Sequence, residues 1–258
     1  SPDSSALLIS ARPYRDRTDE RTVLYDLELD QLTTVIDDYA LALQWLPDGE
    51  RFVFRSTAAL GDSILIKSDV YIGNKSGLDY HPLTKLDVNT LETPEGANLT
   101  MLFLGSTIWS SDEQRVFFSV SDEPFAALPE LIYSVDLAGN LRFEADLIDF
   151  YTDTTVWPPK IIEILVDTAD GNLYIITETE HQMGDAYYIW TVFRHEIDGN
   201  TSLVFEYNFP IRESYQLIKA YDVSPNRRLL ALGGDGFHNV AGMLRVIDLL
   251  TGEVVVQH

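Results

Sequence analysis

The sequence predicts an all-β protein, a β-propeller of four-stranded antiparallel blades, with about five blades visible. The first observation behind this prediction is a short motif that recurs five times: an apolar strand, a polar turn and a second apolar strand. The second is a further predicted hairpin behind each copy, so that every unit supplies four strands. A single blade leaves its apolar faces in water, and packing several blades around an axis buries them.

The motif is clearest between residues 43 and 54, which read L-Q-W-L-P-D-G-E-R-F-V-F. Trp45 lies in the first strand, Asp48 and Gly49 form the turn, and the return strand begins with Phe52. An Asp-Gly pair supplies the positive φ angle that tight hairpin turns need. Alternation of apolar and polar residues, with many β-branched and aromatic side chains, predicts strands rather than helices along the chain.

Aligning the other copies on Asp48 places their turns at Asp3, Asp112, Asp170 and Asn226. The spacings equal or exceed the roughly 40–45 residues of a WD-type blade, which indicates blades with longer loops. We therefore predict a single domain of five repeats. Their approximate boundaries are 1–38, 39–98, 99–149, 150–209 and 210–258.

The second hairpin of each unit turns at residues that favour turns. These turns lie near Asp30, at Gly73-Asn74, at Ala138-Gly139-Asn140, at Asp198-Gly199-Asn200 and at Thr251-Gly252. In the second unit, residues 70–72 are the best match to the third strand. Glycine and asparagine tolerate the backbone angles of two-residue and longer hairpin loops, so each of these positions predicts a chain reversal.

The units W-L-P-D-G-E-R-F-V-F and W-S-S-D-E-Q-R-V-F-F, with the later turns D-L-A-G-N and D-L-L-T-G-E, resemble TolB-type, WD-repeat-like β-propeller repeats. The resemblance extends over nearly the whole chain and implies the propeller fold. It slightly favours a location outside the cytoplasm. Repeats of this kind occur in binding scaffolds, peptidase-associated domains and periplasmic proteins, so the resemblance predicts the fold rather than the function.

The sequence begins at the turn of the first copy, so the innermost strand of the first blade is missing from it. It ends with residues 254–258, the predicted outer strand of the fifth copy. We expect that a strand beyond His258 completes the first blade or that the chain is part of a ring of six to eight blades. The alternative is a five-bladed ring closed by less regular strands.

The composition restricts the partners. The chain has 18 Lys and Arg against 41 Asp and Glu, a net charge of −23. Such a charge repels phosphate backbones and anionic membrane surfaces, so we expect no nucleic-acid partner. The sequence has no apolar run long enough to span a bilayer, which predicts no membrane insertion within this chain. Cysteine is absent, which excludes disulfides, thiolate metal sites and a cysteine nucleophile.

Binding residues are expected on the long loops that join hairpins and blades, because a rigid scaffold holds such loops in place. Aromatic side chains on these loops are the candidates for a recognition surface. They are Phe125, Trp157, Tyr187, Tyr188 and Phe237, together with His238. For each of them, packing of the loop onto the blades is the competing interpretation. The arginines at 12, 15, 17 and 21 lie among acidic residues and are interpreted as a solvated loop.

Motifs for catalysis are few. There is no G-x-S-x-G nucleophile elbow, and the five histidines lack metal-ligand spacing, so we predict no catalytic residue and no metal ligand. His195 lies in a strand pattern, which favours a structural role. We expect no cofactor, with a bound divalent cation left open by the acidity. The carboxylates are numerous enough that a glycosidase-like pair lining a central channel also stays open.

These observations predict a non-catalytic binding or protein-interaction scaffold that forms a module of a larger protein. Its partner would be another protein or another domain of the same polypeptide. One alternative is an enzyme with its site in the channel, such as a glycoside-active propeller. The other is an extracytoplasmic domain that senses a small ligand.

Overall fold

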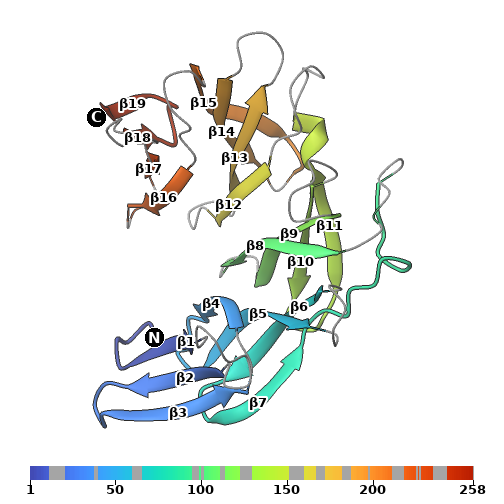
Figure 1. Ribbon diagram of the computed structural model, residues 1–258, viewed down its shortest axis with the longest axis vertical. Helices are drawn as coiled ribbons and strands as arrows, with labels where there is room; N and C mark the ends of the chain where they lie inside the picture. The colour runs from blue at the N-terminus through green and yellow to red at the C-terminus, as the bar shows by residue number, and fades with distance from the viewer. Residues whose placement is uncertain are drawn as a thin grey trace. The chain divides into compact units, whose positions relative to one another are not determined.

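The computed structural model describes residues 1–11, 21–37, 40–59, 66–94, 99, 102–110, 114–122, 130–150, 160–166, 172–181, 187–196, 198–210, 218–224, 226, 228–234 and 243–257. These residues confirm the predicted fold class, an all-β propeller of four-stranded antiparallel blades (Figure 1). The chain divides into two compact units. One comprises residues 1–124 and 131–144, and the other comprises residues 125–130 and 145–258.

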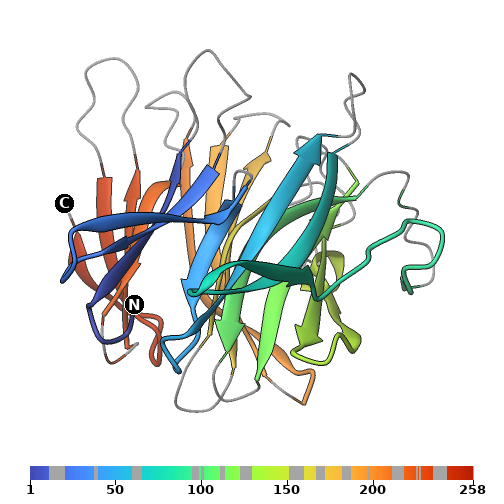
Figure 2. The same cartoon turned by 90° about the horizontal axis from the view of Figure 1, so that it is seen from below.

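The first unit contains the first two sheets and most of the third. The first sheet has three strands, β1 (Ala6–Ala11), β2 (Arg21–Asp26) and β3 (Gln31–Ile36). The second has four, β4 (Ala40–Trp45), β5 (Arg51–Ala59), β6 (Ile66–Asn74) and β7 (Gly77–Pro82), which lie side by side in blue to cyan in Figure 2. The third has β8 (Phe103–Ser110), β9 (Arg115–Ser121), β10 (Glu130–Asp136) and β11 (Leu141–Asp146).

The second unit begins with the last residues of β11 and the short 3-10 helix η2 (Leu147–Phe150). The fourth sheet has β12 (Lys160–Val166), β13 (Leu173–His181), β14 (Tyr187–His195) and β15 (Thr201–Pro210). The fifth has β16 (Ile218–Val223), β17 (Leu229–Gly234), β18 (Met243–Asp248) and β19 (Val254–Gln257). Each sheet is a meander, in which strands follow one another in chain order. The division into five repeats of one domain stays a prediction.

Both faces of the second sheet are buried. Side chains alternate between the two faces of a strand, so neighbouring residues of β5 belong to different apolar clusters. Phe52 and Phe54 pack against Leu24, Val35 and other residues of the first sheet. Val53, between them in sequence, joins the cluster formed with the third sheet. In the second unit, one apolar cluster unites the fourth and fifth sheets, with Trp190, Ile176, Leu230 and Ile247 at its centre. Burial on both faces explains why β5 reads as a continuous apolar run from Phe52 to Phe54.

Aspartate and asparagine side chains build the hairpin turns. Each accepts a hydrogen bond from the backbone N–H two residues further along the chain, the pattern of an Asx turn. This bond is formed by Asp3, Asp26, Asp48, Asn74, Asp136, Asp198 and Asp248. The Asn140 side chain, with two backbone amides, holds the pKa of the Asp136 carboxyl below its usual value. Part of the chain's acidity therefore has a local structural role.

Candidate functional site

The ends of the strands show where each sheet has its longer connections. In the second, third and fifth sheets, the connection between the second and third strands is longer than those inside the hairpins. In the three-stranded first sheet, the longer connection is the one between β1 and β2. In the fourth sheet β13 continues as far as His181, which pairs with Tyr187. Tyr187 and Tyr188, expected on a loop, therefore lie in strand β14. Successive strands are antiparallel, so in the four-stranded sheets these connections lie at the end where the first strand begins. In the first sheet the β1–β2 connection lies at the end where β1 ends. We call the end of each sheet that carries this connection the long-connection end.

Most of the aromatic candidates lie outside the described residues. This applies to Phe125, Trp157, Phe237 and His238, and also to the arginines at 12, 15 and 17. Tyr187 and Tyr188 open strand β14, where their backbones pair with Pro210 and Phe209. A recognition surface formed by these residues stays a prediction.

In the first unit, two polar side chains tie the second sheet to the third. The Gln44 amide oxygen accepts a hydrogen bond from the Trp109 backbone N–H at 2.6 Å. The Arg55 guanidinium donates to the backbone carbonyls of Leu104 and Gly105 on β8. Both contacts join segments about 50 or more residues apart, and they satisfy backbone groups at the edge of β8. They therefore fix neighbouring sheets rather than present reactive groups.

In the second unit, the first strands of the fourth and fifth sheets bring a carboxylate and a phenol together. Glu163 of β12 accepts a hydrogen bond from the hydroxyl of Tyr221 on β16. Burial and this hydrogen bond raise the pKa of the Tyr221 hydroxyl, which stays protonated at neutral pH. Tyr221 nevertheless keeps 39% of its surface exposed. The Tyr221 hydroxyl therefore donates to Glu163 on a side chain that is partly open to solvent.

A buried cation lies in the same unit. Arg245 of β18 is 3% exposed, and its guanidinium carbon lies 4.7 Å from the ring centroid of Tyr207. Its Nη2 donates a hydrogen bond to the Tyr207 hydroxyl at 3.2 Å. The aromatic face and the hydroxyl together compensate part of the cost of removing the charge from water. Sequence alone did not single out Arg245, because its partner comes from a different sheet.

His195 is buried at the end of β14, in agreement with a structural role. Its Nδ1 lies 2.8 Å from the Thr201 hydroxyl, and its ring stacks on Phe150 with centroids 5.9 Å apart. Within the described ranges, no group of three or more His, Asp or Glu side chains is gathered as a metal site requires. In that part of the chain there is also no helix long and apolar enough to cross a membrane.

Asp146 provides a test of the electrostatics at the end of β11. Burial, followed by the nearby Asp149, raises the pKa of the Asp146 carboxyl, although the Ile148 N–H donates to it at 3.0 Å. Because the folded state holds this proton more tightly than the unfolded state, stability falls as pH rises through and above the unfolded pKa. We expect Asp146→Asn to raise the melting temperature at pH 7 and to leave it almost unchanged at pH 3. Melting curves across this range check the prediction, which a lower melting temperature of the variant at pH 7 would contradict.

Comparisons with models of protein families and with curated proteins find no match. Among solved structures, a prolyl endopeptidase matches 99% of this chain with a TM-score of 0.55 and 12% identity. The chain spans 33% of that protein's length. An oligogalacturonate lyase from Vibrio parahaemolyticus matches 98% of the chain and 74% of its own, with a TM-score of 0.50 and 11% identity. The propeller domain of the Trilobed protease from Pyrococcus furiosus matches 96% of this chain and 78% of its own, with a TM-score of 0.49 and 11% identity. At these identities the likeness concerns the fold alone.

Proposed function

We propose that the chain is a non-catalytic binding scaffold whose ligand surface is the long-connection end of its sheets. The observation that supports this most directly is the asymmetry of the connections on a framework of doubly buried strands. Turns inside hairpins are closed by their own Asx hydrogen bonds, while the longer connections carry Trp157, Phe125 and Phe237. Rigid scaffolds with aromatic loops are typical of recognition surfaces.

The polar contacts of the first strands also support a scaffold. Gln44 and Arg55 of the second sheet form hydrogen bonds with the backbone of β8 in the third sheet. These bonds hold the two sheets together. Under this proposal the partner is another protein or another domain of the same polypeptide. The net charge of −23 favours a partner surface with positive charge.

A second candidate is a propeller enzyme that acts on carbohydrate. The specific observation in its favour is the Glu163–Tyr221 pair, because a partly exposed phenol hydrogen-bonded to a carboxyl group is an arrangement that can hold the hydroxyl groups of a sugar. The likeness to an oligogalacturonate lyase is a likeness of fold and raises this candidate only by analogy.

One experiment separates the two candidates. Binders selected from a displayed peptide library on the wild-type chain are measured against a variant with Trp157→Ala and Phe237→Ala. We expect at least a tenfold loss of affinity, since aromatic anchors contribute more than about 1.4 kcal/mol each at such surfaces. The matched control is Leu29→Ala with Leu203→Ala, two exposed residues outside these connections, which should leave affinity unchanged.

The same preparation is incubated with oligogalacturonate and with neutral oligosaccharides, and product formation is followed. Turnover that Glu163→Gln abolishes would favour the enzyme over the scaffold. Binders that respond equally to the loop variant and to the control variant would contradict the proposed surface.

A further inference from the structure

Arg245 is the only lysine or arginine that lies buried among the described residues, with 3% of its surface exposed. It stands opposite Leu232 in the β17–β18 ladder, so both side chains point to the same face of the fifth sheet. Leu232 is fully buried and belongs to the apolar cluster that unites the fourth and fifth sheets. A full positive charge therefore lies beside an apolar core.

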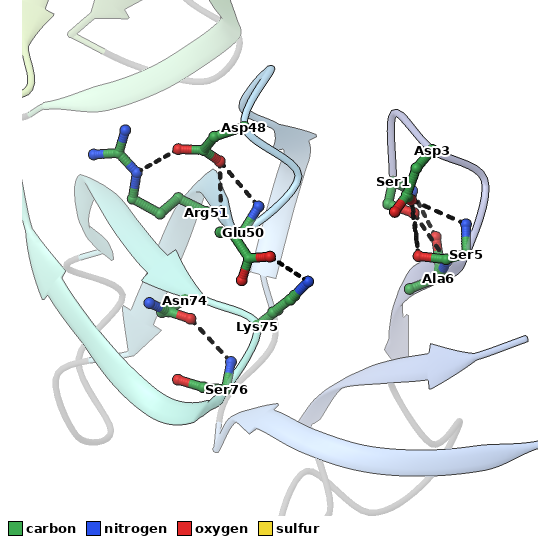
Figure 3. A network of polar contacts seen from close by, with 10 residues as sticks. All are labelled: Ser1, Asp3, Ser5, Ala6, Asp48, Glu50, Arg51, Asn74, Lys75 and Ser76. Carbon is green, nitrogen blue, oxygen red and sulfur yellow. Dashed lines mark hydrogen bonds and ion pairs between the residues drawn. The ribbon is translucent and has the colours of Figure 1, made fainter. Parts of the chain in front are cut away.

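Other arginines of the described residues show how this chain accommodates a guanidinium. Five of them form ion pairs with carboxylates. One is Arg51 with Asp48, whose atoms Nε and Oδ2 lie 2.7 Å apart (Figure 3). The other four pairs are Arg115–Asp136, Arg142–Glu144, Arg194–Glu196 and Arg228–Asp248. The side chains of these five arginines keep between 13% and 56% of their surface exposed, so each is paired and also partly in water.

The contacts of Arg245 are of another kind. Its Nη1 donates to a neighbouring backbone carbonyl at 3.3 Å, and its Nη2 donates to the Tyr207 hydroxyl at 3.2 Å. Within the described ranges no carboxylate pairs with it, although a guanidinium has five N–H groups to donate. Asp248, close to it in β18, binds Arg228 at 2.8 Å. Glu206 precedes Tyr207 in β15 and therefore points to the opposite face of that strand.

A buried charge without a counter-charge is costly. Burial removes the hydration of the ion, and only an opposite charge in good geometry recovers the loss. The face and the hydroxyl of Tyr207 recover part of it, since neither carries a negative charge. The chain has 41 Asp and Glu, yet its most buried arginine is the one that lacks a carboxylate in the described structure. This arrangement indicates a site that an anion completes.

The residues around the guanidinium place it on the solvent side of the apolar cluster. Gln257 stands opposite Arg245 in the β18–β19 ladder, on the same face of the sheet, and is exposed. Tyr207, on the outer strand of the fourth sheet, is half-buried. The charged group therefore lies next to the outer strands β15 and β19, where a small anion approaches from solvent.

We propose that Arg245, held against the ring of Tyr207, is a binding site for the carboxylate group of a ligand. The planar fork of a guanidinium matches the two oxygens of a carboxylate. The net charge of −23 disfavours polyanions and the higher charge of a phosphate. The site uses the fourth and fifth sheets alone, so it stands whether or not the long connections bind a partner.

Titration with acetate tests the site in the wild-type chain. Acetate replaces chloride at constant ionic strength, and NMR of isotope-labelled arginine follows each guanidinium Nε–H group. The signal that Arg245→Met removes is assigned to Arg245. We expect this signal to shift saturably with acetate. The signal of Arg228, which is already bound to Asp248, should not move.

The variant Arg245→Met separates an anion site from a structural arginine. Replacing an unpaired buried charge by an apolar side chain should leave the melting temperature in chloride unchanged or raise it. Acetate should raise the melting temperature of the wild type and not that of Arg245→Met, because a ligand stabilises only the chain that binds it. The matched control Arg228→Met removes an exposed, paired guanidinium and should respond to acetate as the wild type does.

Two further probes identify the source of the carboxylate. They are N-acetyl-alanyl-alanine and its amide, and the acid should bind at least about tenfold more tightly than the amide. Tighter binding of the acid than of acetate assigns the site to the carboxyl end of a peptide, and equal binding assigns it to a small organic acid.

The proposal is overturned if the Arg245 signal does not move with acetate, or if the dipeptide amide binds as well as the acid. Tighter binding of phosphate than of acetate would contradict the assignment to a carboxylate. Equal stabilisation of the wild type and Arg245→Met by acetate would show that the arginine has a structural role only.

Discussion

Replacing Trp190 with alanine is expected to destabilise the chain by about 3–5 kcal/mol, because it empties the centre of the core between the fourth and fifth sheets. Trp190 is fully buried in β14 and belongs to the apolar cluster with Ile176, Leu230 and Ile247. The indole ring is fully buried in this cluster, so its removal leaves a large cavity and the loss should lie near the upper end. Urea unfolding followed by circular dichroism measures it.

The control for this prediction is Leu203→Ala in the neighbouring strand β15, where the side chain is 55% exposed. Its effect should stay within about 0.5 kcal/mol, as for surface substitutions in general. A loss below about 1 kcal/mol for Trp190→Ala would contradict the packing between these two sheets.

Gly252→Ala is expected to cost about 2–4 kcal/mol, from backbone strain and overpacking together. Gly252 has a φ angle of 72°, in the left-handed region that favours glycine. A Cβ atom at this position would lie 2.1 Å from the backbone oxygen of Val204, which a side-chain movement cannot relieve. The free energy of unfolding in urea, compared with that of the wild type, checks the expectation.

Gly199→Ala separates the two contributions. Gly199 has a φ angle of 92°, yet nothing lies within 4 Å of the added Cβ. Only strain should remain, at about 1 kcal/mol. Equal losses for the two variants would show that the turn carrying Gly252 does not approach Val204 as described.

Local chemistry explains which parts of the fold could be predicted from the sequence. The turns at Asp48 and Asp136 depend on residues within the turn itself, and the expected third strand at 70–72 lies inside β6. The extension of β13 to His181 was not predicted, because it depends on pairing with β14. The first strands β4, β8, β12 and β16 each have an extra residue relative to the strand they pair with. These irregularities likewise depend on register, which only the partner strand defines.

The residues of the candidate site were harder to predict from the sequence, because their contacts also depend on distant strands. The Glu163–Tyr221 and Tyr207–Arg245 contacts each join different sheets, and neither has a local sequence signal. The aromatic residues proposed for recognition were chosen by type and by place in a loop. Such a choice identifies a surface, but it does not define the positions of side chains within it.

The Asx turns have a consequence for how the chain reaches its native state. In four hairpins the turn is closed by a hydrogen bond between an aspartate side chain and the backbone two residues later; the aspartates are Asp48, Asp136, Asp198 and Asp248. Closing so short a loop costs little conformational entropy before the two strands pair. Such turns are described in all five sheets, so we expect folding to begin in several places at once. Refolding should therefore proceed along parallel routes, and loss of any one turn aspartate should slow only the routes that start there.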